Sequence, residues 1–246
     1  FSTIVSAVKE GRGIYDNIRK CVKYLLSSNI GEVLTIFIAS MIGLIFKDLG
    51  FGIPLLAMHL LWVNLITDSL PAFALGFEEP EDDIMLEKPR PKKESFFAHG
   101  MAPAIILEGM MIGGLTLAAY AIGHYFDGLA GNLDASYTGA MIGQTMAFVT
   151  LSTAQLFHSF NVKTDHTLFT KKLFNNKVLW GAFALGIVLQ IAIVYIPGLN
   201  NLFKVIPLTL PQLAICFGLA MSTILVMEIV KLIKLLFKKT MKQNKK

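Results

Sequence analysis

Apolar side chains fill six stretches of the chain, each long enough to cross a bilayer as a helix. They lie at about 24–46, 54–77, 101–126, 139–160, 178–196 and 211–230. A membrane-spanning helix needs roughly 20 mostly apolar residues, because every backbone N–H and C=O must find its partner within the segment. The pattern therefore predicts an all-α, polytopic membrane protein with six transmembrane helices.

The segment before the first span has a different pattern. Its apolar residues recur at roughly helical spacing between charged ones: Ile4, Val5, Val8, Ile14, Ile18 and Val22. This pattern predicts a helical stalk that leads directly into the first span. A stalk with no domain in front of it, in a chain that starts with Phe1, leads us to expect that the chain is part of something longer.

Composition and charge support a membrane protein and set its expected orientation. The chain is 54% hydrophobic and 16% charged, with a mean hydropathy of +0.60, whereas soluble domains carry about 25% charged residues. All 22 Lys and Arg residues except Lys47 and Lys204 flank the spans on one side. Basic loops mark the cytoplasmic side, so both termini are expected in the cytoplasm, with the plasma membrane as the location. Because these residues are spread over four short segments, no nucleic-acid partner is expected.

Four acidic residues lie inside the predicted spans, where an ionisable group is costly and is a functional candidate by default. Glu228 lies one helical turn from Lys231, which predicts an ion pair at the membrane interface. For Glu108, a hydrogen-bonded structural role is favoured over transport. Glu32 and Asp68 remain as candidate cation ligands.

Oxygen-bearing side chains accompany both of these acids. Asn29 lies three residues before Glu32, and Asn64 and Thr67 share a helix face with Asp68. These side chains offer only hard oxygen donors, which favour calcium, magnesium or alkali ions over copper or zinc. Calcium accepts about six to eight oxygens in flexible geometry, so a mixture of amides and carboxylates suits it best.

Two further features of the spans concern the backbone. Pro71 has no N–H to give to the carbonyl of Thr67, which predicts an opened turn with free carbonyls beside Asp68. In the third span, Gly109, Gly113 and Gly114 predict close packing against a neighbouring helix.

The motifs YLLSSNIGEVL and LWVNLITDSLPAFALGFEEPEDDIM resemble the fifth and sixth membrane helices of the calcium-transporting P-type ATPases, bacterial type. The resemblance covers the whole chain. It implies that 1–23 is the end of a phosphorylation domain with its stalk helix and that 24–77 is the ion-binding hairpin. It further implies a cytoplasmic loop at 78–98, a four-helix support at 99–236 and a basic cytoplasmic tail at 237–246.

The same resemblance implies a set of cation ligands: Asn29, Glu32, Asn64, Thr67 and Asp68. In TMAFVTLSTAQLFHSFN it also places Gln155 where the sarcoplasmic-reticulum pump has an acid, as in plasma-membrane-type calcium pumps. Two calcium ions would be poorly compensated without that acid. We therefore expect one calcium ion per cycle, near Asn64 and Asp68, and expect Glu32 to carry protons back.

The family's DKTGT phosphorylation motif and nucleotide pocket are missing from this sequence. The resemblance therefore implies a translocase whose ATP and magnesium are bound by a missing N-terminal half, and an inactive fragment without it. Two alternatives stay open. One is a P-type pump for another hard cation, magnesium or manganese, and the other is a non-enzymatic channel or regulatory membrane module.

Overall fold

The computed structural model describes residues 2–47, 50–81, 84–86, 91, 94–98, 100–125, 138–164 and 173–243, with side chains as far as 236. Within these residues the structure is helical and contains no strand. Its elements are α1 (Ser2–Ile45), α2 (Ala57–Trp62), the π-helix η2 (Val63–Thr67), α3 (Ser69–Leu75), α4 (Met101–Tyr125), α5 (Gly139–Lys163), α6 (Lys177–Tyr195), α7 (Leu199–Phe203) and α8 (Leu210–Gln243). The basic residues Lys88, Arg90, Lys92, Lys93, Lys171, Lys172, Lys245 and Lys246, which contribute to the predicted orientation, lie outside the described residues.

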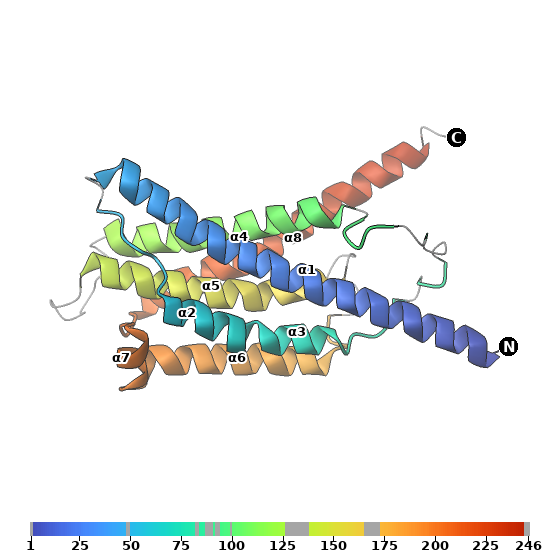
Figure 1. Cartoon of the computed structure of the whole chain (residues 1–246), viewed down its shortest axis with the longest axis horizontal. Helices are drawn as coiled ribbons and strands as arrows, with labels where there is room; N and C mark the ends of the chain where they lie inside the picture. Colours follow the sequence, from blue (N-terminus) through green and yellow to red (C-terminus); the bar gives the residue numbers. More distant parts are fainter. Residues whose placement is uncertain are drawn as a thin grey trace.

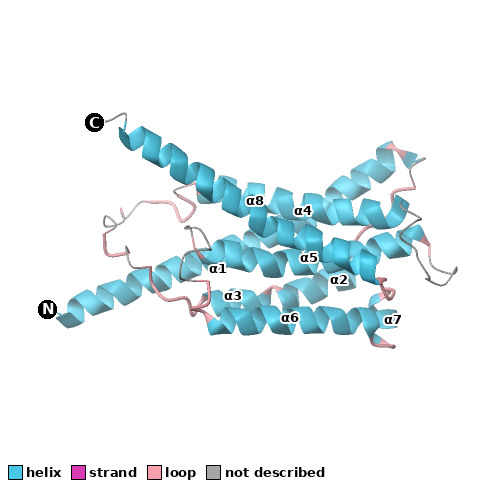
Figure 2. Cartoon of the chain, turned by 180° about the vertical axis from the view of Figure 1, so that it is seen from behind, coloured by secondary structure: helices cyan, strands magenta, loops and turns pink. Residues whose placement is uncertain are grey.

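Stalk and first span form one continuous helix. α1 runs for 44 residues, and its N-terminal part extends beyond the bundle (Figure 1). α8 likewise continues past the predicted end of the last span, into the segment predicted as a tail. Seen from behind, α1 and α8 diverge toward the two chain termini, which lie on the same side of the bundle (Figure 2).

Within the described residues, five helical segments are long and apolar enough to cross a membrane: Ser2–Ile45, Ala57–Leu75, Met101–Tyr125, Lys177–Tyr195 and Leu210–Leu236. They confirm a polytopic all-α membrane fold. The remaining predicted span, 139–160, corresponds to α5, which is not among these five. Most of the 25 residues of α5 are buried, because it packs against α1, α4, α6 and α8. A helix enclosed by other helices has little contact with lipid, so it can carry polar side chains. Thr145, Ser152, Thr153 and Ser159 donate to backbone oxygens of α5 itself.

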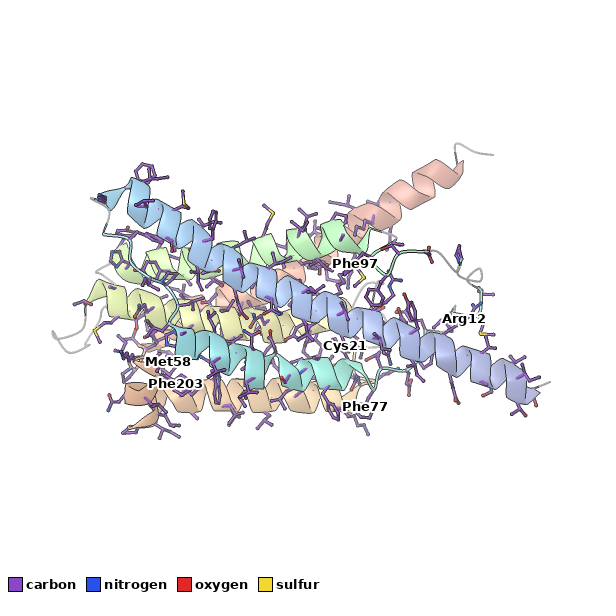
Figure 3. The ribbon with its side chains drawn as sticks, viewed as in Figure 1. Arg12, Cys21, Met58, Phe77, Phe97 and Phe203 are labelled. Atoms are coloured by element: carbon purple, nitrogen blue, oxygen red, sulfur yellow. The ribbon has the colours of Figure 1, made fainter. Side chains whose placement is uncertain are left out.

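A short helix that the sequence pattern did not predict, α7, lies at the end of the bundle away from the termini. Its Phe203 packs edge to face on Trp62, with ring centroids 5.4 Å apart. The backbone oxygen of Phe203 lies 2.8 Å from Nε2 of the buried His59. Figure 3 shows Phe203 beside the start of α2, near Met58. α7 thus fixes the entry of the helical segment that carries Asp68.

Close packing of α4 against α1 depends on individual glycines. A methyl group added at Gly109 would lie 2.5 Å from Cγ2 of Ile30 and 2.9 Å from the backbone oxygen of Ser27, and one at Gly113 would lie 2.9 Å from the backbone oxygen of Gly31. The prediction of tight contact holds at these two positions. It is wrong at Gly114, which is exposed and has no atom within 4 Å of an added methyl group.

This difference gives a matched pair of substitutions. We expect Gly109→Ala to destabilise the bundle by about 1–3 kcal/mol, because the backbone of α1 must move away. Gly114→Ala should be neutral or stabilising by about 0.5–1 kcal/mol, since alanine is the better helix former. Thermal unfolding of the detergent-solubilised protein measures both. Equal effects of the two substitutions would contradict the assigned contact.

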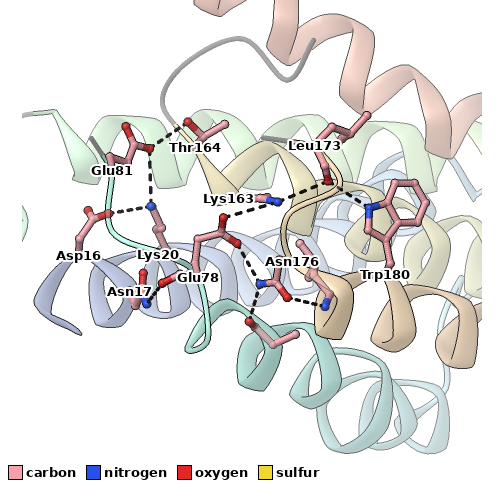
Figure 4. A network of polar contacts seen from close by, with 12 residues as sticks. Asp16, Asn17, Lys20, Glu78, Glu81, Lys163, Thr164, Leu173, Asn176 and Trp180 are labelled. Atoms are coloured by element: carbon pink, nitrogen blue, oxygen red, sulfur yellow. Dashed lines mark hydrogen bonds and ion pairs between the residues drawn. The ribbon is translucent and has the colours of Figure 1, made fainter. Parts of the chain in front are cut away.

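The loop after α3 is attached to three helices through Glu78. Asn17 of α1 donates its side-chain N–H to the backbone oxygen of Glu78 at 2.7 Å. Asn176, at the start of α6, donates to Oε2 of Glu78 at 2.9 Å and to the backbone oxygen of Ala74 at 2.9 Å. Lys163, at the end of α5, lies 3.5 Å from Oε1 of Glu78. Burial lowers the pKa of Lys163, and the charge of Glu78 opposes that shift. Figure 4 shows this network.

A second contact in the same region involves Glu81. Lys20 of α1 lies 2.7 Å from Asp16 and 3.7 Å from Oε1 of Glu81. Thr164 donates to the same oxygen at 2.9 Å (Figure 4). The stalk part of α1 is therefore joined, through a loop of a few residues, to the helical segment that carries Asp68.

Candidate ion-binding site

Glu32 is at the centre of the candidate site. Its side chain is buried, with a relative exposure of 4%. Asn64 of η2 donates to Oε2 at 2.6 Å, and Gln155 of α5 donates to Oε1 at 3.0 Å. The structure thus joins three of the predicted residues from three separate parts of the chain. All of them contribute oxygen atoms that a hard cation could bind in place of the present hydrogen bonds.

Asp68 lies beside this group, and its charge interacts electrostatically with that of Glu32. The carboxylate is fully buried. Tyr24 of α1 donates its hydroxyl to Oδ1 at 3.1 Å. Ser28 lies near, but no hydrogen bond of good geometry joins it to Asp68.

Three buried oxygens in this region have no hydrogen-bond partner among the described residues: Oδ2 of Asp68, Oε1 of Gln155 and Oγ of Ser28. A buried polar atom without a partner costs about 1–3 kcal/mol, and more when it is charged. A bound cation would satisfy acceptor oxygens of this kind. The arrangement therefore favours a cation ligand over a purely structural hydrogen-bond network.

The helix carrying Asn64 and Asp68 changes its geometry at the site. The N–H of Asp68 donates to the oxygen of Val63, five residues back, at 2.8 Å, and the π-helix Val63–Thr67 ends at a turn on Asp68. The sequence predicted an opened turn beside Asp68, because Pro71 has no N–H to donate. The structure has a widened turn there instead, closed by the bond between residues five apart. Widened π turns of this kind are frequent at functional sites.

The other two predicted ligands are not joined to Glu32 or Asp68. Asn29 is half-buried, and its amide donates to the oxygen of Leu25 on its own helix at 2.8 Å. Thr67 is buried and donates to the oxygen of Val63 at 3.0 Å. Each keeps an acceptor oxygen, so their role as ligands stays a prediction.

A second buried polar cluster lies between α1, α4 and α5. Lys23 Nζ is 2.7 Å from Oε1 of Glu108, and Nε2 of His158 is 3.5 Å from Oε2 of Glu108. Ser27 Oγ lies 3.0 Å from the same His158 nitrogen. The Glu108 and His158 side chains are 3% and 0% exposed. The ring of His158 stacks on that of Tyr24 with centroids 6.1 Å apart, so this cluster borders the site at Asp68.

The structural role expected for Glu108 therefore takes the form of a buried ion pair. The sequence pattern assigned no role to His158. The available signal for a polar cluster was the spacing of Lys23 and Ser27, which lie four residues apart on one face of their helix. At the end of the last span, Glu228 lies 3.5 Å from Lys231, as expected from their spacing. No group of three or more His, Cys, Asp or Glu side chains that could hold a metal occurs in the part of the chain that the structure describes.

Fold and site together define a polytopic membrane domain with buried, oxygen-lined acids at mid-span. The family model for the C-terminus of cation-transporting ATPases matches residues 52–233. The chain therefore belongs to this family of cation-transporting ATPases, by their C-terminal membrane domain.

Three curated relatives carry names that refer to calcium. The chain is 43% identical over 241 residues to calcium-transporting ATPase 1 of Bacillus cereus, covering 95% of this chain and 26% of the relative. It is 39% identical over 209 residues to the calcium-transporting ATPase of Bacillus subtilis, covering 85% and 22%. It is 35% identical over 237 residues to a calcium-transporting ATPase of Listeria monocytogenes, covering 95% and 24%. The chain spans about a quarter of the length of these relatives.

Proposed function

We propose that this chain is the ion-translocating membrane part of a P-type pump that exports calcium from the cytoplasm, with both termini cytoplasmic and the plasma membrane as its location. The observation that carries the proposal is the oxygen-lined site at Glu32, which accepts hydrogen bonds from Asn64 and Gln155 beside the buried Asp68. The names of the bacterial relatives support calcium as the transported ion.

The chemistry of the site suits calcium better than a smaller divalent ion. Carboxylate and amide oxygens lie on flexible side chains, and calcium accepts about six to eight such ligands, whereas magnesium demands a tight octahedron. The neutral Gln155 leaves Glu32 and Asp68 as the two acids that this chain contributes to the site. Two carboxylates balance the charge of one divalent ion, which supports transport of a single calcium ion.

The proposal requires a partner, the N-terminal half of the same pump, which would supply the phosphorylation and nucleotide sites with their ATP and magnesium. Asn64 belongs to the ion site but is exposed, and its neighbours Leu61 and Leu65 are 66% and 63% exposed. An amide that faces acyl chains at mid-membrane is unfavourable. Cover by further helices of the pump would complete the cation's shell.

Energy from ATP would reach the site through α1. The stalk part of this helix is hydrogen-bonded through Asn17 to the loop that follows α3. Its membrane part carries Tyr24, which holds Asp68, and Glu32 itself. A movement of α1 would therefore shift one acid directly and the other through both Tyr24 and the loop.

Stimulation of ATP hydrolysis by different metals tests this function. The full-length protein containing this chain should hydrolyse ATP in response to micromolar calcium. Preferential stimulation by manganese, or by magnesium beyond its role with ATP, would favour the pump for another hard cation. Absence of metal-stimulated hydrolysis in a folded full-length protein would favour the non-enzymatic channel or regulatory module.

Transport by reconstituted vesicles should show one calcium ion moved per ATP, with protons moved in the opposite direction. Calcium-45 uptake measured against phosphate release gives the first ratio, and a pH-sensitive dye inside the vesicles reports the protons. Glu32 accepts hydrogen bonds from two amides and is the acid proposed to carry the protons, so Glu32→Gln should abolish the proton signal. A clean ratio of two calcium ions would contradict the charge argument based on Gln155.

A further inference from the structure

A cavity of about 110 Å³ lies between α1, α4, α5 and α8, on the side of the bundle where both termini lie. Figures 1 and 2 show α1 and α8 diverging on that side, with the start of α4 between them. The charged residues of its wall are four cations and one acid: Arg19, Lys20, Lys23, Lys234 and Asp16.

Two of the four cations have carboxylate partners. Lys20 lies 2.7 Å from Asp16, and Lys23 lies 2.7 Å from Glu108. Their charges are therefore largely balanced inside the protein. Asp16, the acid of the cavity wall, is already paired with Lys20 and does not balance Arg19 or Lys234.

Arg19 and Lys234 have no carboxylate partner among the described residues. The guanidinium of Arg19 donates to the backbone oxygen of Ala98 at 3.3 Å and contacts the sulfur of Met101 at 3.9 Å. Its buried Nε makes no hydrogen bond with any described residue. Among the described residues, the positive charges of Arg19 and Lys234 thus have no carboxylate partner, and Nε of Arg19 is a donor without an acceptor.

The backbone adds to this positive potential. α4 begins at Met101 beside the cavity and runs for 25 residues. Unpaired N–H groups and the helix dipole make the first turn of such a helix favourable for anions. Gly100, directly before it, has φ of +77° and also lines the cavity.

We propose that this cavity binds the phosphate group of an anionic phospholipid in the leaflet on the side of the termini. An arginine with free N–H groups suits a phosphate oxygen pair, and lysine adds a point charge. Basic pockets between membrane helices on the cytoplasmic side are known to accept anionic headgroups. Leu232 and Ile233, on the membrane side of Lys234, are 51% and 46% exposed and offer apolar surface to the acyl chains.

Lipid titration of the full-length protein followed by native mass spectrometry tests this site. The probes are phosphatidylglycerol and, as the neutral reference, phosphatidylcholine. Arg19→Gln and Lys234→Gln should each weaken phosphatidylglycerol binding roughly fivefold, and the double variant should weaken it further, because each cation near the surface is worth about 1 kcal/mol. The matched control is Lys177→Gln, which removes an exposed charge at the start of α6, outside the cavity.

A further arm adds inorganic phosphate in place of lipid. Phosphate binding with the same dependence on Arg19 and Lys234 would keep the site but make free phosphate its ligand. Equal losses in the two cavity variants and in Lys177→Gln, or equal binding of both lipids, would overturn the proposal. If Arg19→Gln fails to fold, Lys234→Gln at the exposed end of α8 still decides the question.

Discussion

Replacing Asp68 by asparagine should lower the apparent calcium affinity of the full-length pump by at least roughly 100-fold. Residues that only support a metal ligand typically contribute about 10–100-fold to affinity, and Asp68 is proposed as a ligand itself. The substitution removes one of the two negative charges at a fully buried position while keeping the shape of the side chain. Calcium dependence of ATP hydrolysis and of calcium-45 uptake measures the effect.

The control for this experiment is Glu228→Gln. It also removes a carboxylate charge from a buried position in a membrane helix, but Glu228 is paired with Lys231 near the end of the last span. Its calcium affinity should match that of the unmodified protein. If Asp68→Asn retained normal calcium dependence in folded protein, Asp68 would not be a ligand, and the transport proposal would lose its basis.

The sequence predicted the membrane helices well because their signal is local. Twenty apolar residues must form a helix in lipid wherever they occur, so α4 and α6 begin within a residue or so of the predicted spans. α7 was not predicted, because a helix of five residues is too short to show a helical periodicity of apolar positions. α5 has a weaker hydropathy signal than the other spans, because most of its side chains are buried against protein and such positions accept side chains that hydrogen-bond.

The sequence predicted the residues of the candidate site but not which of them contact one another. Residue spacing places Asn64 and Asp68 on one face of their helix, yet it does not tell which of them meets Glu32. In the structure Asn64 donates a hydrogen bond to Glu32, and Asp68 accepts one from Tyr24. Helical spacing also places Asn29 near Glu32, but the amide of Asn29 bonds back to its own helix. Rotation of one helix relative to another is a tertiary property that a single sequence does not specify.

The Glu108 cluster shows the same limit at larger sequence separation. Its members come from α1, α4 and α5, and no local pattern links them. An acid within an apolar span indicates only that some partner must exist, because an isolated charge at that depth is expensive. The structure identifies that partner as Lys23, with His158 on the other oxygen.

From this pairing we expect Glu108→Leu to destabilise the membrane domain by about 3–5 kcal/mol, the usual cost of removing one member of a buried ion pair. Lys23 is only 18% exposed, so its charge would remain without a counter-ion in a largely apolar place. Thermal unfolding in detergent, followed by size-exclusion chromatography of the full-length protein, gives the change in stability.

The double variant Lys23→Met/Glu108→Leu decides whether charge balance is the cause. Replacing both members of a buried pair by apolar residues of similar volume is often neutral, so the second substitution should restore most of the stability lost in the first. Coupling of this kind between contacting residues is what a double-mutant cycle measures. A double variant as unstable as Glu108→Leu alone would indicate that packing of Glu108 against His158, and not its pairing with Lys23, supports the contact between α1 and α4.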